Sequence, residues 1–335
     1  MPNGNKGEWS ELYAFLKVLI TGEISEEDGS MYTVEKMSRF ECGAEKNYTW
    51  EDGNIIVHSL LDQKVDTALL NLLLPDMFNE IKSGKGSYSC PVMEKVMQLL
   101  NIERIKSASS NKDDFKIKFK NSKLRGYNVK SKIGHSAGII NASRRTNFVF
   151  EVDCPLSNAE LNRLGGPKKI VKAIYAAGGS LTFRKCPESY ALQLGTDATE
   201  MLAIMLIEYF RADEKSVSGL IDQLFAGNKR VLNKPKIIWR NKITDVLLNS
   251  NEYQRPGKIC KRDSSSASGG LIYVEQDGSV SCNIYSSKDD AGDYLYDTAF
   301  LDTASTGRHE FGKLYNDPDE NYRAIKLNLN VKGTH

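Results

Sequence analysis

Alternation of apolar and polar residues marks the most informative segment of the chain. In DFKIKFK at 114–120, three apolar residues fall on one face, while Asp114 and three lysines fall on the other. The segment YNVKSKI at 127–133 alternates in the same way, and the NSKLRG between them has the composition of a turn. A period of two is typical of half-buried strands. The pattern therefore predicts a two-stranded hairpin over 114–133.

A helical period predicts an amphipathic helix over residues 7–20, whose apolar residues share one broad sector. Glu8 and Glu11 fall inside that sector, near its N-terminal end. The helix dipole is a sufficient explanation for acids at a helix start. A carboxylate on a core-facing side, however, needs a partner such as a base, a metal ion or water. The helix alone leaves both interpretations open.

The other periodicities predict a mixed α/β chain with a β-rich C-terminal part. Helices are expected at 58–82 with a break at Pro75, 91–101, 157–176, 197–212, 216–226 and 240–249, with a helical turn at 136–145. Strands are expected at 147–152, 271–276, 281–286 and 322–331. We expect a core with helical additions over 1–255 and a β-rich part over 256–335, within one domain or two.

The composition excludes several classes of protein. With 335 residues, 40% hydrophobic and 26% charged, the chain is neither a disordered tail protein nor a disulfide miniprotein. The longest strongly apolar stretch, LLNLLL, is too short to span a bilayer, and the N-terminus has no apolar run of the signal-peptide type. The six cysteines are scattered without a CxxC pair. This favours a cytoplasmic protein with reduced thiols and argues against a structural zinc.

Basic residues are concentrated in one part of the chain. Residues 104–145 contain twelve lysines and arginines against two aspartates, a net +10, so the rest of the chain carries −8. A second run at 229–242 adds six basic residues and no acid. A solvated lysine face is the simple alternative. Charge held on folded strands favours a polyanion partner, most simply nucleic acid.

The hairpin also carries residues that suit phosphodiester hydrolysis, since Asp114 begins one strand and Lys130 lies near the middle of the next. The reaction needs a hard cation such as Mg²⁺, an activated water and neutralisation of charge on phosphorus. An acid followed about sixteen residues later by a lysine is the layout of a PD-(D/E)xK nuclease, although lysine-rich hairpins also match it by chance. Asn128 stands where that layout expects an acid, so a second carboxylate must come from elsewhere in the chain. The candidates are Glu8, Glu11 and Glu151.

Four segments in order along the chain resemble the HpaII family of type II restriction endonucleases. They are NKGEWSELYAFLK at 5–17, GYNVKSKIG at 126–134, IINASRRTNFVFEV at 139–152 and LDTASTGRHEFGKLY at 301–315. The resemblance implies a PD-(D/E)xK restriction-endonuclease-like core, with a mixed sheet flanked by helices, helical insertions and a β-rich C-terminal part that recognises DNA. It also implies Mg²⁺-dependent cleavage of both strands of a short double-stranded DNA site.

The same resemblance assigns roles to individual residues. Asp114 resembles the metal-binding acid and Lys130 the catalytic lysine. An acid from the first helix completes the site in related nucleases, which favours Glu11 ahead of Glu8 and then Glu151.

Sequence specificity requires donors that reach base edges, and arginine is the best reader of guanine. Arg308 and at least one of Arg144 and Arg145 are expected at base edges, with a phosphate contact or an ion pair as the alternative for each. The remaining candidate DNA contacts are polar neighbours of these arginines or of the lysine strand: Lys132, His135, Asn141, Ser143, Thr303, Ser305 and His309.

A type II site-specific restriction endonuclease is the leading hypothesis. Because Asn128 replaces an expected acid, a non-catalytic DNA-recognition component of a multi-subunit restriction system is the alternative. A structure-selective repair nuclease is a third hypothesis, which predicts cleavage without a fixed sequence. The partners expected besides DNA are a second copy of the chain on a palindromic site or other restriction-system subunits.

Overall fold

The computed structural model describes residues 2–107, 113–134, 136, 138–226, 231–248, 269–285, 287–304 and 310–333. These residues form two compact units. Unit 1 takes its described residues from 2–136 and 269–288, and unit 2 takes them from 138–248 and 289–333. Each unit is therefore built from two separate stretches of the chain.

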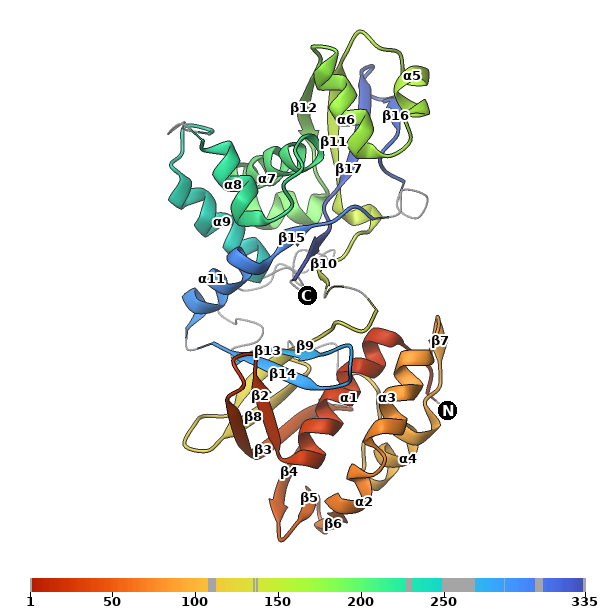
Figure 1. Ribbon diagram of the computed structural model, residues 1–335, viewed down its shortest axis with the longest axis vertical. Coiled ribbons are helices and arrows are strands. Elements are labelled where there is room, and N and C mark those ends of the chain that lie inside the picture. The colour runs from red at the N-terminus through yellow and green to blue at the C-terminus, as the bar shows by residue number, and fades with distance from the viewer. Residues whose placement is uncertain are drawn as a thin grey trace. The chain divides into compact units, whose positions relative to one another are not determined.

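A mixed sheet of nine strands forms most of unit 1 (Figure 1). Its strands, in order across the sheet, are β2 (Glu23–Glu26), β14 (Val280–Ile284), β13 (Gly270–Val274), β9 (Arg125–Ser131), β8 (Phe115–Phe119), β3 (Met31–Glu41), β4 (Ala44–Glu51), β5 (Asn54–His58) and β6 (Gln63–Asp66). The pairs β9–β13 and β14–β2 are parallel, and the other pairs are antiparallel. Because β2 also pairs with β3, the strands from β2 round to β3 close into a ring of six.

Helix α1 (Lys6–Thr21) packs between this sheet and the other helices of unit 1, as Figure 1 shows. It starts with a capping box between Asn5 and Glu8 and ends at Gly22, whose φ of 69° is left-handed. Its apolar residues from Trp9 to Ile20 are buried in the core of the unit. The other elements are β1 (Gly4–Asn5), α2 (Thr67–Asn71), α3 (Leu74–Ser83), β7 (Ser87–Tyr88) and α4 (Pro91–Leu99).

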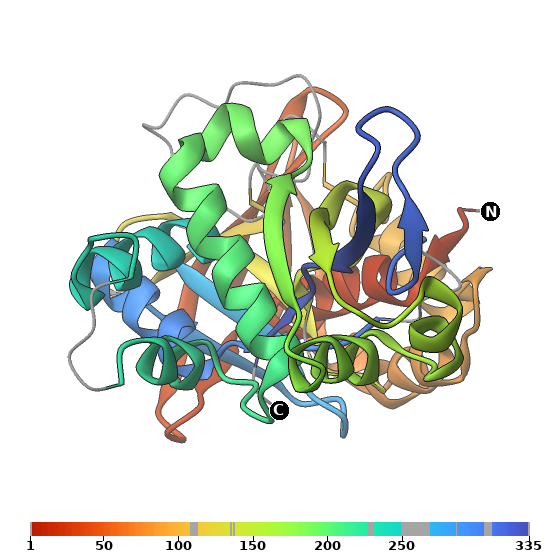
Figure 2. The same cartoon turned by 90° about the horizontal axis from the view of Figure 1, so that it is seen from above.

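Unit 2 contains two smaller sheets and most of the remaining helices. The antiparallel sheet has the order β12 (Ser180–Lys185), β11 (Asn147–Asp153), β17 (Arg323–Asn328) and β16 (Leu314–Asn316). The second sheet has the order β10 (Gly138–Ile140), β18 (Val331–Lys332) and β15 (Phe300–Leu301). The helices are a 3₁₀ turn at Arg144–Thr146, α5 (Asn158–Arg163), α6 (Pro167–Ala176), α7 (Glu188–Arg211), α8 (Val217–Leu224), α9 (Lys236–Leu248) and α11 (Lys288–Thr298). Helix α7 changes direction at Gly195, which has a left-handed φ of 73° (Figure 2).

The strongest sequence patterns predicted these elements correctly. The hairpin expected over 114–133 is the pair β8–β9, in which the apolar residues of β8 are buried and its lysines are half-buried. The helix expected at 7–20 and the strand expected at 147–152 are also confirmed. So is the mixed α/β class. The ring of six strands was not expected.

Several expectations were wrong. The helix expected over 157–176 is two helices, α5 and α6, because Gly165 and Gly166 between them have left-handed φ values. Residues 58–66 are not helical, because Val65 pairs with Ile55 in the β5–β6 hairpin and the helix begins only after Asp66 caps it. The segment 136–145 contains the strand β10 before its 3₁₀ turn, and the C-terminal part contains the unexpected helix α11.

The boundary expected at 255/256 does not separate the two units. Strand β13 pairs in parallel with β9, so residues 269–285 complete the N-terminal sheet instead of joining the later C-terminal strands. No helix among the described residues is both long and apolar enough to cross a membrane.

Candidate active site

The backbone of β9 holds Asp114 at the start of the hairpin. The Asp114 amide donates to the carbonyl of Tyr127 at 3.0 Å, and its carboxylate Oδ2 accepts from the amide of Val129 at 2.7 Å. The register continues from the Phe115–Tyr127 pair, so Asp114 lies across from the buried Asn128. Strand pairing thus fixes the carboxylate beside the residues that flank Lys130.

Glu11 of helix α1 and Lys130 of strand β9 lie within electrostatic reach of Asp114. Burial, and then the charge of Asp114, raise the pKa of Glu11 to about 8. Burial likewise raises the pKa of Asp114, against the hydrogen bond from Val129 and the charge of Lys130. Burial lowers the pKa of Lys130, whereas the two acids oppose that effect. We call these three residues the acid–lysine cluster.

The acid–lysine cluster suits a hard divalent cation. Two buried carboxylates with raised pKa values, of which Asp114 raises that of Glu11 by its charge, favour either a shared proton or a bound cation. Mg²⁺ commonly takes one or two protein carboxylates and completes its shell with water and substrate phosphates. Across the described parts of the chain, no group of three or more His, Cys, Asp or Glu side chains could hold a metal ion. The donor set therefore fits Mg²⁺ with an open shell, and it does not fit a closed zinc site. Each member keeps partial contact with solvent, which leaves the cluster open to a substrate.

Glu8, one helical turn before Glu11, is engaged elsewhere. Its Oε2 accepts from the Asn5 amide at 2.8 Å, and its Oε1 pairs with Lys106 Nζ at 2.7 Å. Burial opposes ionisation of Glu8, yet the bonds from Lys106 and Asn5 keep its pKa below the usual value. The structure thus gives Glu8 a capping and ion-pairing role, and its role as a metal ligand stays a prediction.

Glu151 lies on β11 in unit 2, where Arg184 Nε donates to its Oε2 at 2.7 Å. The Glu151 carboxylate is therefore paired with the guanidinium of Arg184. Its role at a metal stays a prediction.

The candidate DNA contacts have different surroundings. Arg144 is exposed and paired with Glu310, whereas Arg145 is exposed and its guanidinium has no hydrogen bond or ion pair within the described chain. Ser143 caps the 3₁₀ turn, and the Thr303 hydroxyl lies 2.9 Å from that of Tyr209.

The remaining candidate DNA contacts differ in exposure. Lys132 is buried, 3.0 Å from Glu275 and above the ring of Tyr273, so its charge already has a partner in the protein; its contact with DNA stays a prediction. Asn141 is exposed. The predictions for His135, Ser305, Arg308 and His309 lie outside the described residues.

Folding partly neutralises the basic run at 104–145. Lys116 pairs with Glu45 at 2.8 Å and Lys118 with Glu35 at 2.9 Å. Both acids come from the N-terminal strands, so the run is less positive in space than it is in sequence. Sequence patterns missed Arg39 and Lys106, both of which act on Glu11 electrostatically, because neither belongs to a motif.

Comparison with known proteins gives one similarity that covers almost the whole chain. A model of the HpaII restriction endonuclease family matches residues 5–332. The type II restriction enzyme HpaII of Haemophilus parainfluenzae is 28% identical over 358 residues, which cover 98% of each chain. No solved structure matches the chain.

Proposed function

Because the chain belongs to the HpaII restriction endonuclease family, and is therefore a site-specific type II deoxyribonuclease, we propose that its acid–lysine cluster hydrolyses the DNA phosphodiester bond. The observation that carries this proposal is that Glu11, from the first helix, lies close enough to Asp114 and Lys130 of the β8–β9 hairpin for their charges to act on it. Glu11 supplies the second carboxylate that Asn128 does not. A PD-(D/E)xK-type centre is the arrangement that these contacts support best.

Each residue of the cluster has a distinct task in this proposal. Asp114 and Glu11 would hold Mg²⁺, which supplies an activated water and neutralises charge at the phosphate. The ammonium of Lys130, whose charge both acids favour, stabilises negative charge that develops on the phosphoryl oxygens. The hydrogen bond from the Val129 amide fixes the position of one oxygen of the Asp114 carboxylate.

The substrate is a short double-stranded DNA site, of which both strands are cut. We propose a second copy of the chain on a palindromic site as the arrangement that brings one such cluster to each strand. Sedimentation of the protein with and without its DNA site tests this arrangement.

The catalytic assignment is tested with Asp114→Ala, Lys130→Ala and Glu11→Gln in a digest of DNA of known sequence with Mg²⁺. Each variant should cleave at least roughly a hundredfold more slowly than wild type, because each loses a group that acts on the scissile phosphate or its metal. Sequence-specific binding should stay measurable by gel shift, because affinity comes from many other contacts. Removal of Mg²⁺ with a chelator should stop cleavage by the wild type.

Glu35→Gln is the matched control, since Glu35 is a carboxylate of the same sheet in an exposed pair with Lys118. It should cleave like wild type. Near-normal cleavage by any of the three cluster variants would overturn its assignment. A wild-type protein that shifts DNA but never cuts it would indicate a recognition subunit instead.

A further inference from the structure

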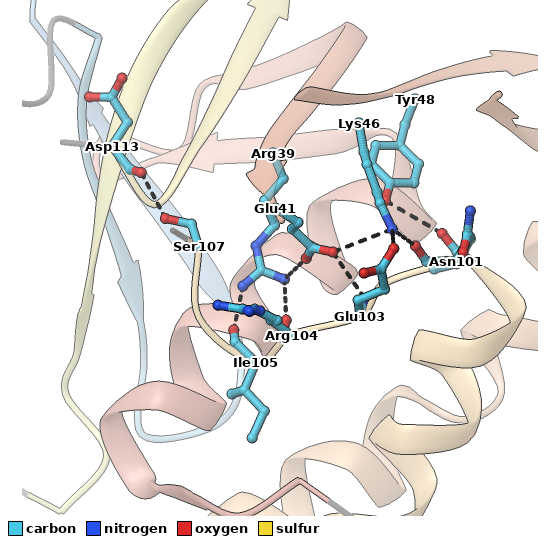
Figure 3. A network of polar contacts seen from close by, with 11 residues as sticks. Arg39, Glu41, Lys46, Tyr48, Asn101, Glu103, Arg104, Ile105, Ser107 and Asp113 are labelled. Atoms are coloured by element: carbon cyan, nitrogen blue, oxygen red, sulfur yellow. Dashed lines mark hydrogen bonds and ion pairs between the residues drawn. The ribbon is translucent and has the colours of Figure 1, made fainter. Parts of the chain in front are cut away.

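Buried polar contacts fix the position of residues 103–105, which precede the β8–β9 hairpin (Figure 3). Arg39, only 3% exposed, donates to the carbonyl of Arg104 at 2.9 Å and to that of Ile105. It also pairs with the fully buried Glu41 at 2.8 Å, whose other oxygen accepts from the Glu103 amide at 2.9 Å. Burying an Arg–Glu pair carries a large desolvation cost. Because this pair bonds mainly to backbone, its effect is to fix where residues 103–105 run.

Lys106 is the next residue along this fastened segment. Its Nζ lies 2.7 Å from Oε1 of Glu8. Glu8 precedes Glu11 by one turn of helix α1. Its charge acts on Glu11 and on Asp114. Yet 57% of its side chain is exposed. An ammonium has three donors, and Glu8 takes one of them. Lys106 therefore presents free donors to solvent beside the acid–lysine cluster.

We propose that Lys106 binds a backbone phosphate of the DNA next to the scissile bond, from a position that the contacts of Arg39 and Glu41 fix. The inference rests on the proposed function, because only a DNA strand bound at the cluster brings a phosphate there. Two carboxylates repel a polyanion, so an exposed cation at their edge lowers that barrier. The charge of Lys130 is already engaged by Asp114 and Glu11, so it is less available than that of Lys106 for an additional phosphate.

The test measures the affinity of the full chain for DNA against salt concentration, in the absence of metal. Lys106→Met removes the charge and keeps most of the chain length. It should weaken binding to specific and non-specific DNA alike and reduce the slope of log K against log salt by about one. Lys106→Arg should restore the slope. The matched control is Lys64→Met, because Lys64 is 59% exposed and pairs with Glu51 at 2.6 Å, at the edge strand β6. It should leave the slope unchanged.

The outcomes separate this inference from the proposed function. An unchanged slope in Lys106→Met overturns the inference, even where the thermal midpoint falls, because a purely structural ion pair affects stability alone. That result leaves the catalytic assignment intact as long as Asp114→Ala still abolishes cleavage. Full cleavage by Asp114→Ala would instead overturn the proposed function, whatever Lys106 does.

Discussion

At the scale of single residues, two glutamates one helical turn apart have opposite surroundings. Glu8 caps the helix and pairs with Lys106, so its pKa is low and it stays ionised. Glu11 faces the carboxylate of Asp114 in a partly buried place, and its pKa is raised to about 8. Two acids of the same type thus take different roles because their environments differ.

The raised pKa of Glu11 makes the metal-free protein less stable as the pH rises. Between pH 4.5 and about 8 the unfolded chain loses the Glu11 proton while the folded chain keeps it, so the free energy of unfolding falls through this window. The interval sets an upper limit of roughly 5 kcal/mol, which contact with solvent reduces. Glu11→Gln should therefore be more stable than wild type at pH 8 and similar to it near pH 4.5.

Urea unfolding of both proteins at several pH values, without metal, checks this expectation. Mg²⁺ should raise the thermal midpoint of the wild type and have little effect on Glu11→Gln. If the variant were less stable than wild type at pH 8, the carboxylate of Glu11 would stabilise the folded protein there, which would contradict the raised pKa.

The surroundings of the two neighbouring arginines differ, and we predict that Arg145 is the one that reads a base. The guanidinium of Arg145 has no partner within the described chain, whereas that of Arg144 already pairs with Glu310. Arg145→Ala should lower specific binding by roughly 1–3 kcal/mol, with little effect on non-specific binding. Arg144→Ala is the comparison and should weaken both alike, as should any arginine on phosphate. Gel-shift titrations on DNA with and without the site measure both; an equal loss in Arg145→Ala would place Arg145 on the backbone. Arg308 stays a predicted base reader, tested in the same way.

At the scale of elements, the link between β3 and the segment before β8 depends on one buried ion pair. Arg39→Met should cost about 3–5 kcal/mol of unfolding free energy, because it leaves Glu41 buried without its main cationic partner. Glu41→Gln in the same chain should recover part of that loss, since it removes the buried charge. Where Arg39→Met is still folded, its DNA-binding salt slope should fall as it does for Lys106→Met.

Urea titration of the single and double variants measures these stability effects, with Lys64→Met as a surface control that should leave stability almost unchanged. A loss in Arg39→Met no larger than that of the control would mean that other contacts hold the segment at 103–105.

At the scale of the whole molecule, the sheet of unit 1 is completed by residues 269–285, which follow most of unit 2 in the sequence. Strand β13 is buried along its length between β9 and β14, and β14 pairs with β2 to close the ring. A fragment of residues 1–255 therefore lacks two strands of its sheet and should not fold into a stable nuclease. Circular dichroism, thermal unfolding and the cleavage assay on this fragment, beside the full chain, check the expectation. Cooperative unfolding with retained cleavage would show that 269–285 is dispensable.

The sequence alone determined the features that depend on neighbours along the chain. The alternation at 114–120 predicted the buried and exposed faces of β8, and the helical period at 7–20 predicted the buried side of α1. Such patterns are readable because one strand or helix buries its apolar face whatever it packs against. The sequence spacing of Asp114 and Lys130 also predicted that the two residues lie near each other, since the pairing of a short hairpin fixes which residues are neighbours.

Only the tertiary structure decided which distant residues share a site. It separated Glu11 from Glu8, brought Arg39 and Lys106 to the same acids, and neutralised two charges of the basic run with Glu35 and Glu45. It also placed residues 269–285 in the N-terminal sheet through parallel pairing. Contacts of this kind join segments far apart in sequence. Such contacts form only when whole elements pack together, and the periodicity of hydrophobic residues within one segment does not predict them.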